Sequence, residues 1–276
     1  GSSSKRSLKT LSGEGLIGQF GIGLLSCFMV TDKITLITRS FKEKQAVKWE
    51  AFIEGTYSSS PVSDEFEAGT KLFLPLRKDY VSTYSKDKVL TLIKNYGTFL
   101  PISIHFQDGE DVEVLDSQRF PWSSEKEAVI DFGKNWFQGH YKHFIQLESQ
   151  CGLTKGIAFI SPRAVPQGAK APHQVYIKNM LISEGSEHVL PSWFFFGKAI
   201  INSEELIPTA SREDIHNNEV LTRVRQDFEI CIEDHFEWLI QSDPEALEEI
   251  IQTHDMAIKA FALENEKIYR MIIGRL

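Results

Sequence analysis

Alternation of apolar and polar residues predicts that the first part of the chain is rich in strands. Residues 33–39 (KITLITR), 46–53 (AVKWEAFI) and 70–76 (TKLFLPL) place apolar side chains largely at every second position, which is the period of a half-buried strand. Because short turns separate these segments, we expect an antiparallel meander. Residues 86–96 then show helical spacing, and residues 100–106 return to the pattern of a strand.

The second part of the chain combines strands with a helical end. Residues 155–160 and 174–182 predict strands, and the aromatic residues 191–196, Trp193 among them, predict a core segment. From Asn218 onward the periodicity is helical with a break at residues 242–244, which predicts two long closing helices.

A polar stretch divides the two parts and sets the expected domain boundaries. It is rich in Ser, Pro and charged residues and shows little periodicity, which is typical of a linker. We therefore expect a first domain over residues 5–108, a linker over 109–125 and a second domain over 126–276.

Composition narrows the class of protein. The chain has 276 residues, of which 42% are hydrophobic, so it is long enough for about two packed domains. Its formal net charge of -8 provides no overall field that attracts nucleic acid. The three cysteines form no C-x-x-C pair and no apolar run reaches ~18 residues, so we expect no disulfide framework and no membrane span. Residues 1–4 resemble the scar of an expression tag, and residues 5–10 lack the apolar core of a signal peptide, so we expect a cytoplasmic protein.

A glycine-rich segment is the first candidate for chemistry. Gly18, Gly21 and Gly23 form G-x-x-G-x-G, which is neither the dinucleotide fingerprint nor a P-loop. The segment predicts a glycine-rich loop that opens a short buried helix. Such a loop lets backbone N–H groups and the helix dipole face an anion, so a phosphate site is one interpretation. The other is a turn that packs tightly against a neighbouring strand. Spacing alone leaves both open.

Three segments carry a resemblance to a known family. Residues 16–33 (LIGQFGIGLLSCFMVTDK) resemble the second glycine motif of the ninety-kilodalton heat-shock protein chaperones, which are ATPases of the gyrase, heat-shock-protein, histidine-kinase and mismatch-repair group. Residues 69–76 (GTKLFLPL) are similar to the Gly-Thr strand of the family's nucleotide pocket. The family's middle-domain signature resembles residues 175–182 (VYIKNMLI), 190–194 (LPSWF) and 201–213 (INSEELIPTASRE).

The resemblance implies a fold. It is an α/β (α+β sandwich) fold, in which the C-terminal half of a nucleotide-binding sandwich is followed by an α/β middle domain ending in long helices.

The resemblance also implies site residues. Thr70 would hydrogen-bond in the adenine region, and Arg212 would reach the ATP γ-phosphate from the middle domain. Without the resemblance, Thr70 is an ordinary strand residue and Arg212 a surface arginine beside Glu213. His216 stands where the family usually has a glutamine. The backbone amides that would hold the ATP phosphates belong to Gly18, Gln19, Phe20, Gly21, Ile22 and Gly23.

The implied activity is that of a segment of an ATP-dependent molecular chaperone. In the family, the glutamate that activates water, the asparagine that binds Mg2+ and a D-x-G-x-G loop precede the glycine motif. None of them is found before Gly18, so we expect the magnesium ligand outside this chain and no ATPase activity from the chain alone. The C-terminal dimerisation domain is not found either. A half-domain would expose an edge and apolar surface, so we expect it to be marginally stable or to pair with another copy.

The resemblance implies partners as well. The full-length protein would be a stress-response homodimer in which nucleotide drives lid closure, with partly folded proteins as clients and with no nucleic-acid or membrane partner. Two alternatives stay open. One is a non-catalytic protein-binding module of the same fold. The other is a gyrase-like or mismatch-repair-like ATPase linked to DNA, against which the acidic balance argues.

Overall fold

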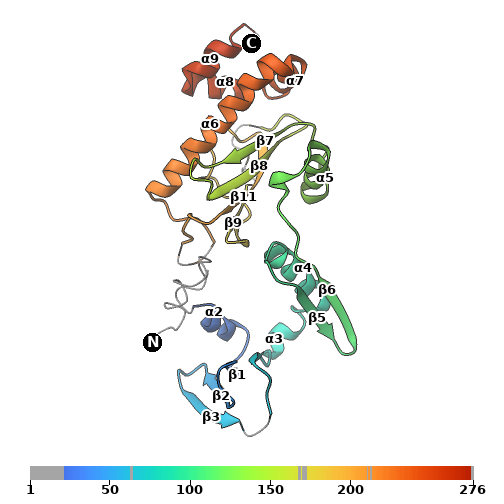
Figure 1. Cartoon of the computed structure of the whole chain (residues 1–276), viewed down its shortest axis with the longest axis vertical. Helices are drawn as coiled ribbons and strands as arrows, with labels where there is room; N and C mark the ends of the chain where they lie inside the picture. Colours follow the sequence, from blue (N-terminus) through green and yellow to red (C-terminus); the bar gives the residue numbers. More distant parts are fainter. Residues whose placement is uncertain are drawn as a thin grey trace. The chain divides into compact units, whose positions relative to one another are not determined.

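A computed structural model describes residues 22–62, 65–166, 169, 173–209, 211 and 213–274 of the chain. These residues divide between two compact units, one ending at Leu92 and the other beginning at Ile93. Helices and mainly antiparallel sheets occur in both (Figure 1). The predicted α+β class is therefore confirmed, whereas the predicted domain boundaries stay a prediction.

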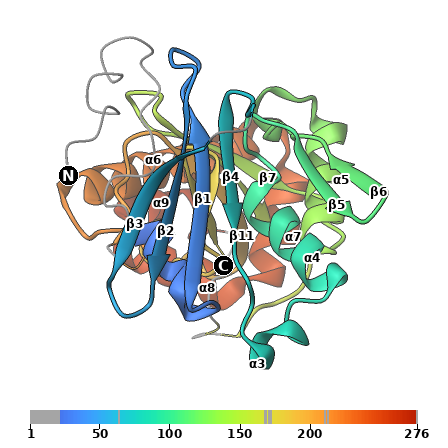
Figure 2. The ribbon, with the colours of Figure 1, turned by 90° about the horizontal axis from the view of Figure 1, so that it is seen from below.

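The first unit is built on a four-stranded antiparallel sheet of order β3-β2-β1-β4, which Figure 2 shows as four neighbouring ribbons. Its strands are β1 (Lys33–Arg39), β2 (Ala46–Phe52), β3 (Tyr57–Val62) and β4 (Gly69–Phe73). The three predicted strands are confirmed. The β3 strand was not predicted, because its run of three serines hides the alternation.

Short helices flank this sheet. The chain enters through α2 (Ile22–Leu25) and the 3-10 turn η1 (Ser26–Met29), and it leaves β4 through α3 (Lys78–Val81). Helix α4 (Lys86–Gly97) confirms the predicted helix and runs across the boundary between the units.

The second unit begins with a hairpin of β5 (Ile104–Asp108) and β6 (Asp111–Leu115), whose turn contains Gly109 at φ 61°. The predicted strand over 100–106 starts too early, because residues 100–103 form a turn that includes Pro101, which has no N–H to give to a ladder. The 3-10 turn η2 (Pro121–Ser123) and helix α5 (Lys126–Phe137) follow.

A five-stranded sheet of order β10-β9-β11-β8-β7 forms the centre of the second unit. All its pairings are antiparallel except β11 with β9. The single strand predicted over 174–182 is wrong, because Lys178 and Asn179 adopt positive φ (51° and 67°) and turn the chain into a hairpin. The strands are β7 (Phe144–Glu148), β8 (Thr154–Ile160), β9 (Gln174–Ile177), β10 (Met180–Ser183) and β11 (Gly197–Ser203).

Four helices follow the sheet: α6 (Glu219–Ser242), α7 (Pro244–Thr253), α8 (Asp255–Glu264) and α9 (Glu266–Ile272). The long first helix confirms the prediction, but the single second helix over 245–273 is wrong. Asn265 accepts a hydrogen bond from the Ile268 backbone N–H (3.1 Å) and so starts a new helix. His254 separates α7 from α8 as well, and its ring nitrogen Nε2 is hydrogen-bonded to the Ser161 carbonyl oxygen (2.8 Å).

Apolar side chains cover both faces of the five-stranded sheet. On one face they pack against α6 to α9, where the Trp193 and Phe261 rings stack at 3.6 Å. The core position predicted for Trp193 is confirmed, since only 3% of it is exposed. On the other face Phe159 and Tyr176 pack with Val129 of α5. No helix in the described ranges is both long enough and apolar enough to cross a bilayer.

Candidate functional site

Only some of the predicted nucleotide-binding residues belong to the part of the chain that the structure describes. Gly18, Gln19, Phe20, Gly21 and Arg212 lie outside the described residues. The structure places the backbone of Ile22, together with Gly23 and Thr70, in the first unit.

The residues that follow the glycine segment form the first turn of a helix. Helix α2 begins at Ile22, and the Ser26 hydroxyl donates to the Gly23 carbonyl oxygen (2.8 Å). A Cβ at Gly23 would meet no heavy atom of the described residues beyond its own helical turn within 4 Å. Close packing therefore does not explain why this position is a glycine. The open space leaves its backbone accessible to a ligand such as a phosphate.

Hydrogen bonds connect this helical turn to the chain that follows β4. The Thr31 hydroxyl, fully buried, donates to the Pro75 carbonyl oxygen (2.6 Å). The Arg77 backbone N–H donates to the Val30 carbonyl oxygen (2.9 Å), and the Arg77 guanidinium lies 3.4 Å from the Asp32 carboxylate. These bonds hold the end of the glycine segment beside the strand that carries Thr70.

Thr70 lies in β4 directly opposite Thr38 of β1, and their hydroxyl oxygens are 2.8 Å apart. The Thr38 hydroxyl also donates to the Gly69 carbonyl oxygen (3.2 Å), so both hydroxyl protons are used within the sheet and the pair offers a ligand its remaining lone pairs. The next row on the same face consists of Trp49, Leu36 and Leu72, which are directly opposite one another across three strands. An apolar strip beside a pair of hydroxyl groups suits a flat heterocycle, and the hydroxyl pair is also an ordinary cross-strand contact.

In the second unit, the two flanks of position 212 are paired with each other. Pro208 and Ile215 form an isolated antiparallel bridge, and the Thr209 backbone N–H donates to the Asp214 carbonyl oxygen (2.8 Å). His216 is exposed, and its backbone N–H donates to the Ile207 carbonyl oxygen (2.8 Å). Backbone hydrogen bonds thus hold together the residues that precede and follow the Ser-Arg-Glu match.

A buried carboxylate just before that loop was missed by the sequence reasoning. The Glu205 side chain is 8% exposed and pairs with the Arg223 guanidinium of α6. It also accepts hydrogen bonds from Thr154 (2.8 Å), Ser149 (3.0 Å) and the Cys151 thiol (3.2 Å). Burial by itself would raise the pKa of Glu205, but these donors together lower it below its ordinary value. No sequence motif predicts this cluster around Glu205, because its residues come from different elements of the fold.

Side chains that could hold a metal ion are not grouped in the described part of the chain. Within those residues, no three His, Cys, Asp or Glu side chains lie close enough together to bind one. The magnesium ligand of the nucleotide site stays a prediction outside this chain.

The known proteins to which this chain is similar include chaperones. No protein-family model matches the chain. The chain is 28% identical over 277 residues to the chaperone protein HtpG of Fusobacterium nucleatum, covering 94% of this chain and 45% of the relative. It is 29% identical to the chaperone protein HtpG of Rickettsia bellii, covering 79% of this chain and 38% of the relative.

A third relative is also an HtpG chaperone. The chaperone protein HtpG of Rhodococcus jostii is 27% identical, covering 80% of this chain and 39% of the relative. The chain thus spans less than half the length of the curated relatives it matches. The predicted resemblance to the ninety-kilodalton heat-shock family is confirmed, and the chain is similar to part of an HtpG chaperone.

Proposed function

We propose that this chain is part of an ATP-dependent molecular chaperone that acts on partly folded proteins. The observation that carries the proposal is the similarity to HtpG over 94% of the chain. That similarity includes the part of the chain that contains both candidate nucleotide segments. In the proposed cycle, nucleotide drives lid closure and transient association of two nucleotide domains in a cytoplasmic homodimer.

The chain's own residues have separate tasks in this proposal. The backbone amides of Gly18 to Gly23 hold the phosphates, Thr70 hydrogen-bonds in the adenine region, and Arg212 stabilises negative charge at the γ-phosphate. ATP supplies the free energy of phosphoryl transfer to water. Three features support these tasks: the open backbone at Gly23, the hydroxyl pair of Thr38 and Thr70, and the paired flanks of position 212.

Other parts of the proposed protein lie outside this chain. The glutamate that activates water and the asparagine that binds Mg2+ belong to a preceding segment, so the chain by itself has no ATPase activity in this proposal. Clients bind exposed apolar surface of the second unit. Met256 (63% exposed) and Leu263 (87% exposed) on α8 offer such surface.

The proposal is tested in a longer protein that contains this chain. ATP binding and steady-state hydrolysis are measured for that protein, for its Arg212→Ala variant and for the isolated chain. Because an arginine that contacts the transferred phosphate acts mainly in the transition state, Arg212→Ala should slow turnover by about 10²-fold or more while sparing binding. The exposed Arg163 provides a matched control, and Arg163→Ala should change neither quantity.

Three results would count against the proposal. Turnover by the isolated chain would show that the general base is not where we place it. An unchanged rate in Arg212→Ala would reduce Arg212 to a surface residue. A longer protein that neither binds nor hydrolyses ATP would favour the non-catalytic binding module.

A further inference from the structure

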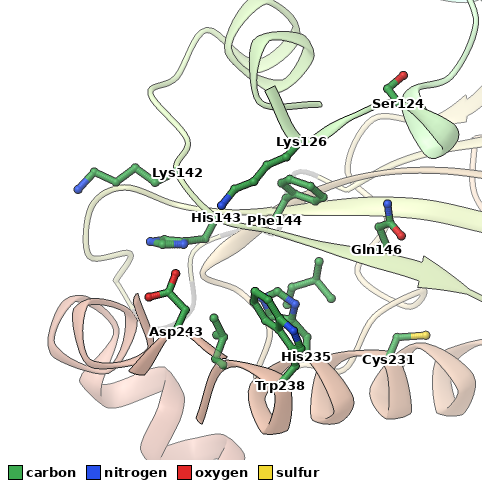
Figure 3. Close-up of a pocket in the computed structure, with 12 residues that line it drawn as sticks. Ser124, Lys126, Lys142, His143, Phe144, Gln146, Cys231, His235, Trp238 and Asp243 are labelled. Atoms are coloured by element: carbon green, nitrogen blue, oxygen red, sulfur yellow. The ribbon is translucent and has the colours of Figure 1, made fainter. Parts of the chain in front are cut away.

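A cavity of about 470 Å³ lies along the outer edge of β7 in the second unit (Figure 3). β7 is the last strand of the five-stranded sheet, and β8 is its only partner among the described strands. Phe144 and Gln146 of β7 line this edge cavity together with His235 and Trp238 of α6, whose side chains rise toward β7 in Figure 3. None of these residues has a task in the proposed nucleotide site.

Hydrogen bonds at both ends of β7 show which of its backbone groups point toward β8. The Ile160 N–H donates to the His143 carbonyl oxygen (3.0 Å), and the Ser149 N–H donates to the Thr154 carbonyl oxygen (2.8 Å). Residues of an antiparallel pair alternate between those that exchange such bonds with the partner strand and those whose N–H and C=O point away from it. In β7 the backbone groups that point away from β8 belong to Phe144, Gln146 and Glu148.

Side chains of α6 satisfy these outward groups near the end of β7. The Cys231 thiol donates to the Glu148 carbonyl oxygen (3.4 Å), and just beyond the strand the Asp227 carboxylate accepts from the Gln150 N–H (3.0 Å). The next position of this helical row, one turn after Cys231, is His235. Its Nε2 atom is buried and has no hydrogen-bond partner among the described residues.

The outward backbone of Phe144 and Gln146 is left open at the edge cavity. No hydrogen bond from another described residue reaches these outward N–H and C=O groups. An open strand edge is a template for a further strand, which lies about 4.8 Å away and matches each donor with an acceptor. An added backbone would also bring both donors and acceptors to His235 Nε2, so either tautomer of this imidazole would gain a partner.

Apolar side chains lie on both faces of the sheet beside this edge. The Phe144 ring packs 6.3 Å from the ring of Phe159 on the face that α5 covers. Trp238, which is 52% exposed, belongs to α6 on the opposite face. Because successive side chains of a strand point to opposite faces, one apolar side chain of an added strand would meet Phe144 and the next would meet Trp238.

The charges around the edge cavity leave one ammonium group without a partner. Lys142 pairs with Glu249 (2.6 Å), and Asp243 accepts from a backbone N–H at the positive N-terminus of α7. Lys126, which also lines the cavity, has no ion-pair partner among the described residues. An occupant with an acidic side chain near Lys126 therefore complements this edge better than one with a basic side chain.

We propose that the edge of β7 binds an extended segment of another polypeptide, which adds to the sheet as a further strand. Its backbone pairs with Phe144 and Gln146, its apolar side chains alternate between the two faces, and an acidic side chain lies near Lys126. Pairing stops at Glu148, where Cys231 already occupies the edge, so the added strand is short. This inference goes beyond the proposed function, whose clients contact apolar side chains and no strand edge, and it stands or falls independently of the ATP cycle.

The test uses the 276-residue chain and a probe peptide of sequence VTVEVT with acetylated and amidated ends. Its β-branched residues favour an extended backbone, and its glutamate supplies the acidic side chain. Hydrogen exchange followed by nuclear magnetic resonance reports on single amides. We expect the peptide at about 1 mM to slow exchange of the Gln146 amide at least about tenfold. The Ile145 amide, which already bonds to β8, should be unchanged.

Two methylated forms of the peptide separate backbone pairing from apolar contact. One carries N-methyl groups at its odd positions and the other at its even positions, so their side chains are identical. Only alternate N–H groups of an added strand face β7. One form should therefore bind at least about tenfold more weakly than the other. If the two forms bind alike, the peptide does not pair as a strand and the proposal is overturned.

Two substitutions at one position test the strand edge itself. Gln146→Pro removes only an outward N–H and no bond to β8, so it should weaken peptide binding, followed at the Phe144 amide, at least about tenfold. Gln146→Thr keeps the N–H and should leave binding within about twofold. Equal binding by the two variants overturns the proposal. If Gln146→Pro does not fold, the methylated peptides decide with the unaltered chain.

Three further results are informative. The proposal is overturned if the peptide causes no saturable slowing at Gln146 up to about 5 mM. It is also overturned if the Gln146 amide is protected in the free chain and dilution removes this protection, since the edge would then pair with a second copy. Lysine in place of the peptide's glutamate should weaken binding about threefold, and tighter binding of the lysine form would contradict the role of Lys126.

Discussion

The four-stranded sheet of the first unit and the five-stranded sheet of the second differ in how much of their surface is covered. All five residues of β4 are exposed, whereas six of the seven residues of β8 are buried. Among the described residues of the first unit, the buried apolar side chains are Ile34, Ala46, Ala51 and Leu90. Since apolar burial contributes about 25 cal/mol per Å², the second unit carries its own stability and the first leaves apolar surface for something else to cover.

The first way to sharpen this comparison is to remove one large side chain from each sheet. Phe159→Ala in β8 should lower the free energy of unfolding of the second unit by about 3–5 kcal/mol, because it empties a fully buried site between aromatic rings. Leu72→Ala in β4, where the side chain is 44% exposed, should cost less than about 1 kcal/mol. Native-state hydrogen exchange measures the two units separately. Equal losses would contradict the comparison.

A buried histidine gives the second unit a pH dependence. Burial lowers the pKa of His173 to about 4, against 6.5 for an exposed imidazole. The unfolded chain therefore takes up this proton at higher pH than the folded chain, and stability falls by up to about 3 kcal/mol as pH falls from 6.5 to 4. His173→Leu should remove this share of the slope in urea unfolding measured across that range. The exposed His140 serves as a control, and an unchanged slope in His173→Leu would refute the assignment.

The Glu205 cluster tests whether polar contacts also anchor the second unit. Glu205→Ala leaves the Thr154 and Ser149 hydroxyls and the Arg223 guanidinium without their shared acceptor, so we expect a loss of about 2–3 kcal/mol. The neighbouring Glu204 is exposed, and Glu204→Ala should cost less than about 0.5 kcal/mol. Thermal unfolding of the two variants measures the difference. Similar losses would mean that the cluster adds nothing.

The smallest effect is expected in the first unit, at the hydroxyl pair. A double-mutant cycle of Thr38→Val and Thr70→Val should give a coupling energy of about 0.5 kcal/mol, typical of a cross-strand pair. Urea unfolding measures it. A coupling energy above about 2 kcal/mol would show that Thr70 is primarily a structural residue, which would weaken its proposed role toward adenine.

The sequence predicted those elements whose apolar pattern is regular. The strands β1 and β2 follow from the alternation of apolar and polar residues, and the long helix α6 follows from the helical spacing of its buried side chains. The β3 strand was not predicted because half of its residues are serine. The break between α8 and α9 was not predicted because a single side-chain cap at Asn265 decides it. Such local hydrogen bonds leave no periodic trace in a sequence.

The candidate site was predicted from motifs alone, and only part of it lies in the described residues. The sequence predicted Thr70 on a strand and a helix at the glycine segment, and the structure shows both. The predicted burial of that helix is wrong, since Leu25 is 62% exposed and Met29 is 69% exposed. The Glu205 cluster was not predicted, because tertiary contacts bring its residues together. The contact of Arg212 with nucleotide stays a prediction.

The measurement that tests the central proposal most directly is nucleotide-dependent protection of a client. Aggregation of a thermally unfolded enzyme is followed by light scattering in the presence of the longer protein, with ATP and without it, and with the Arg212→Ala variant. We expect ATP to change the protection, and we expect this dependence to disappear in Arg212→Ala, since hydrolysis would no longer drive the cycle. Protection that is the same with and without ATP would contradict the account and identify a non-catalytic binding module.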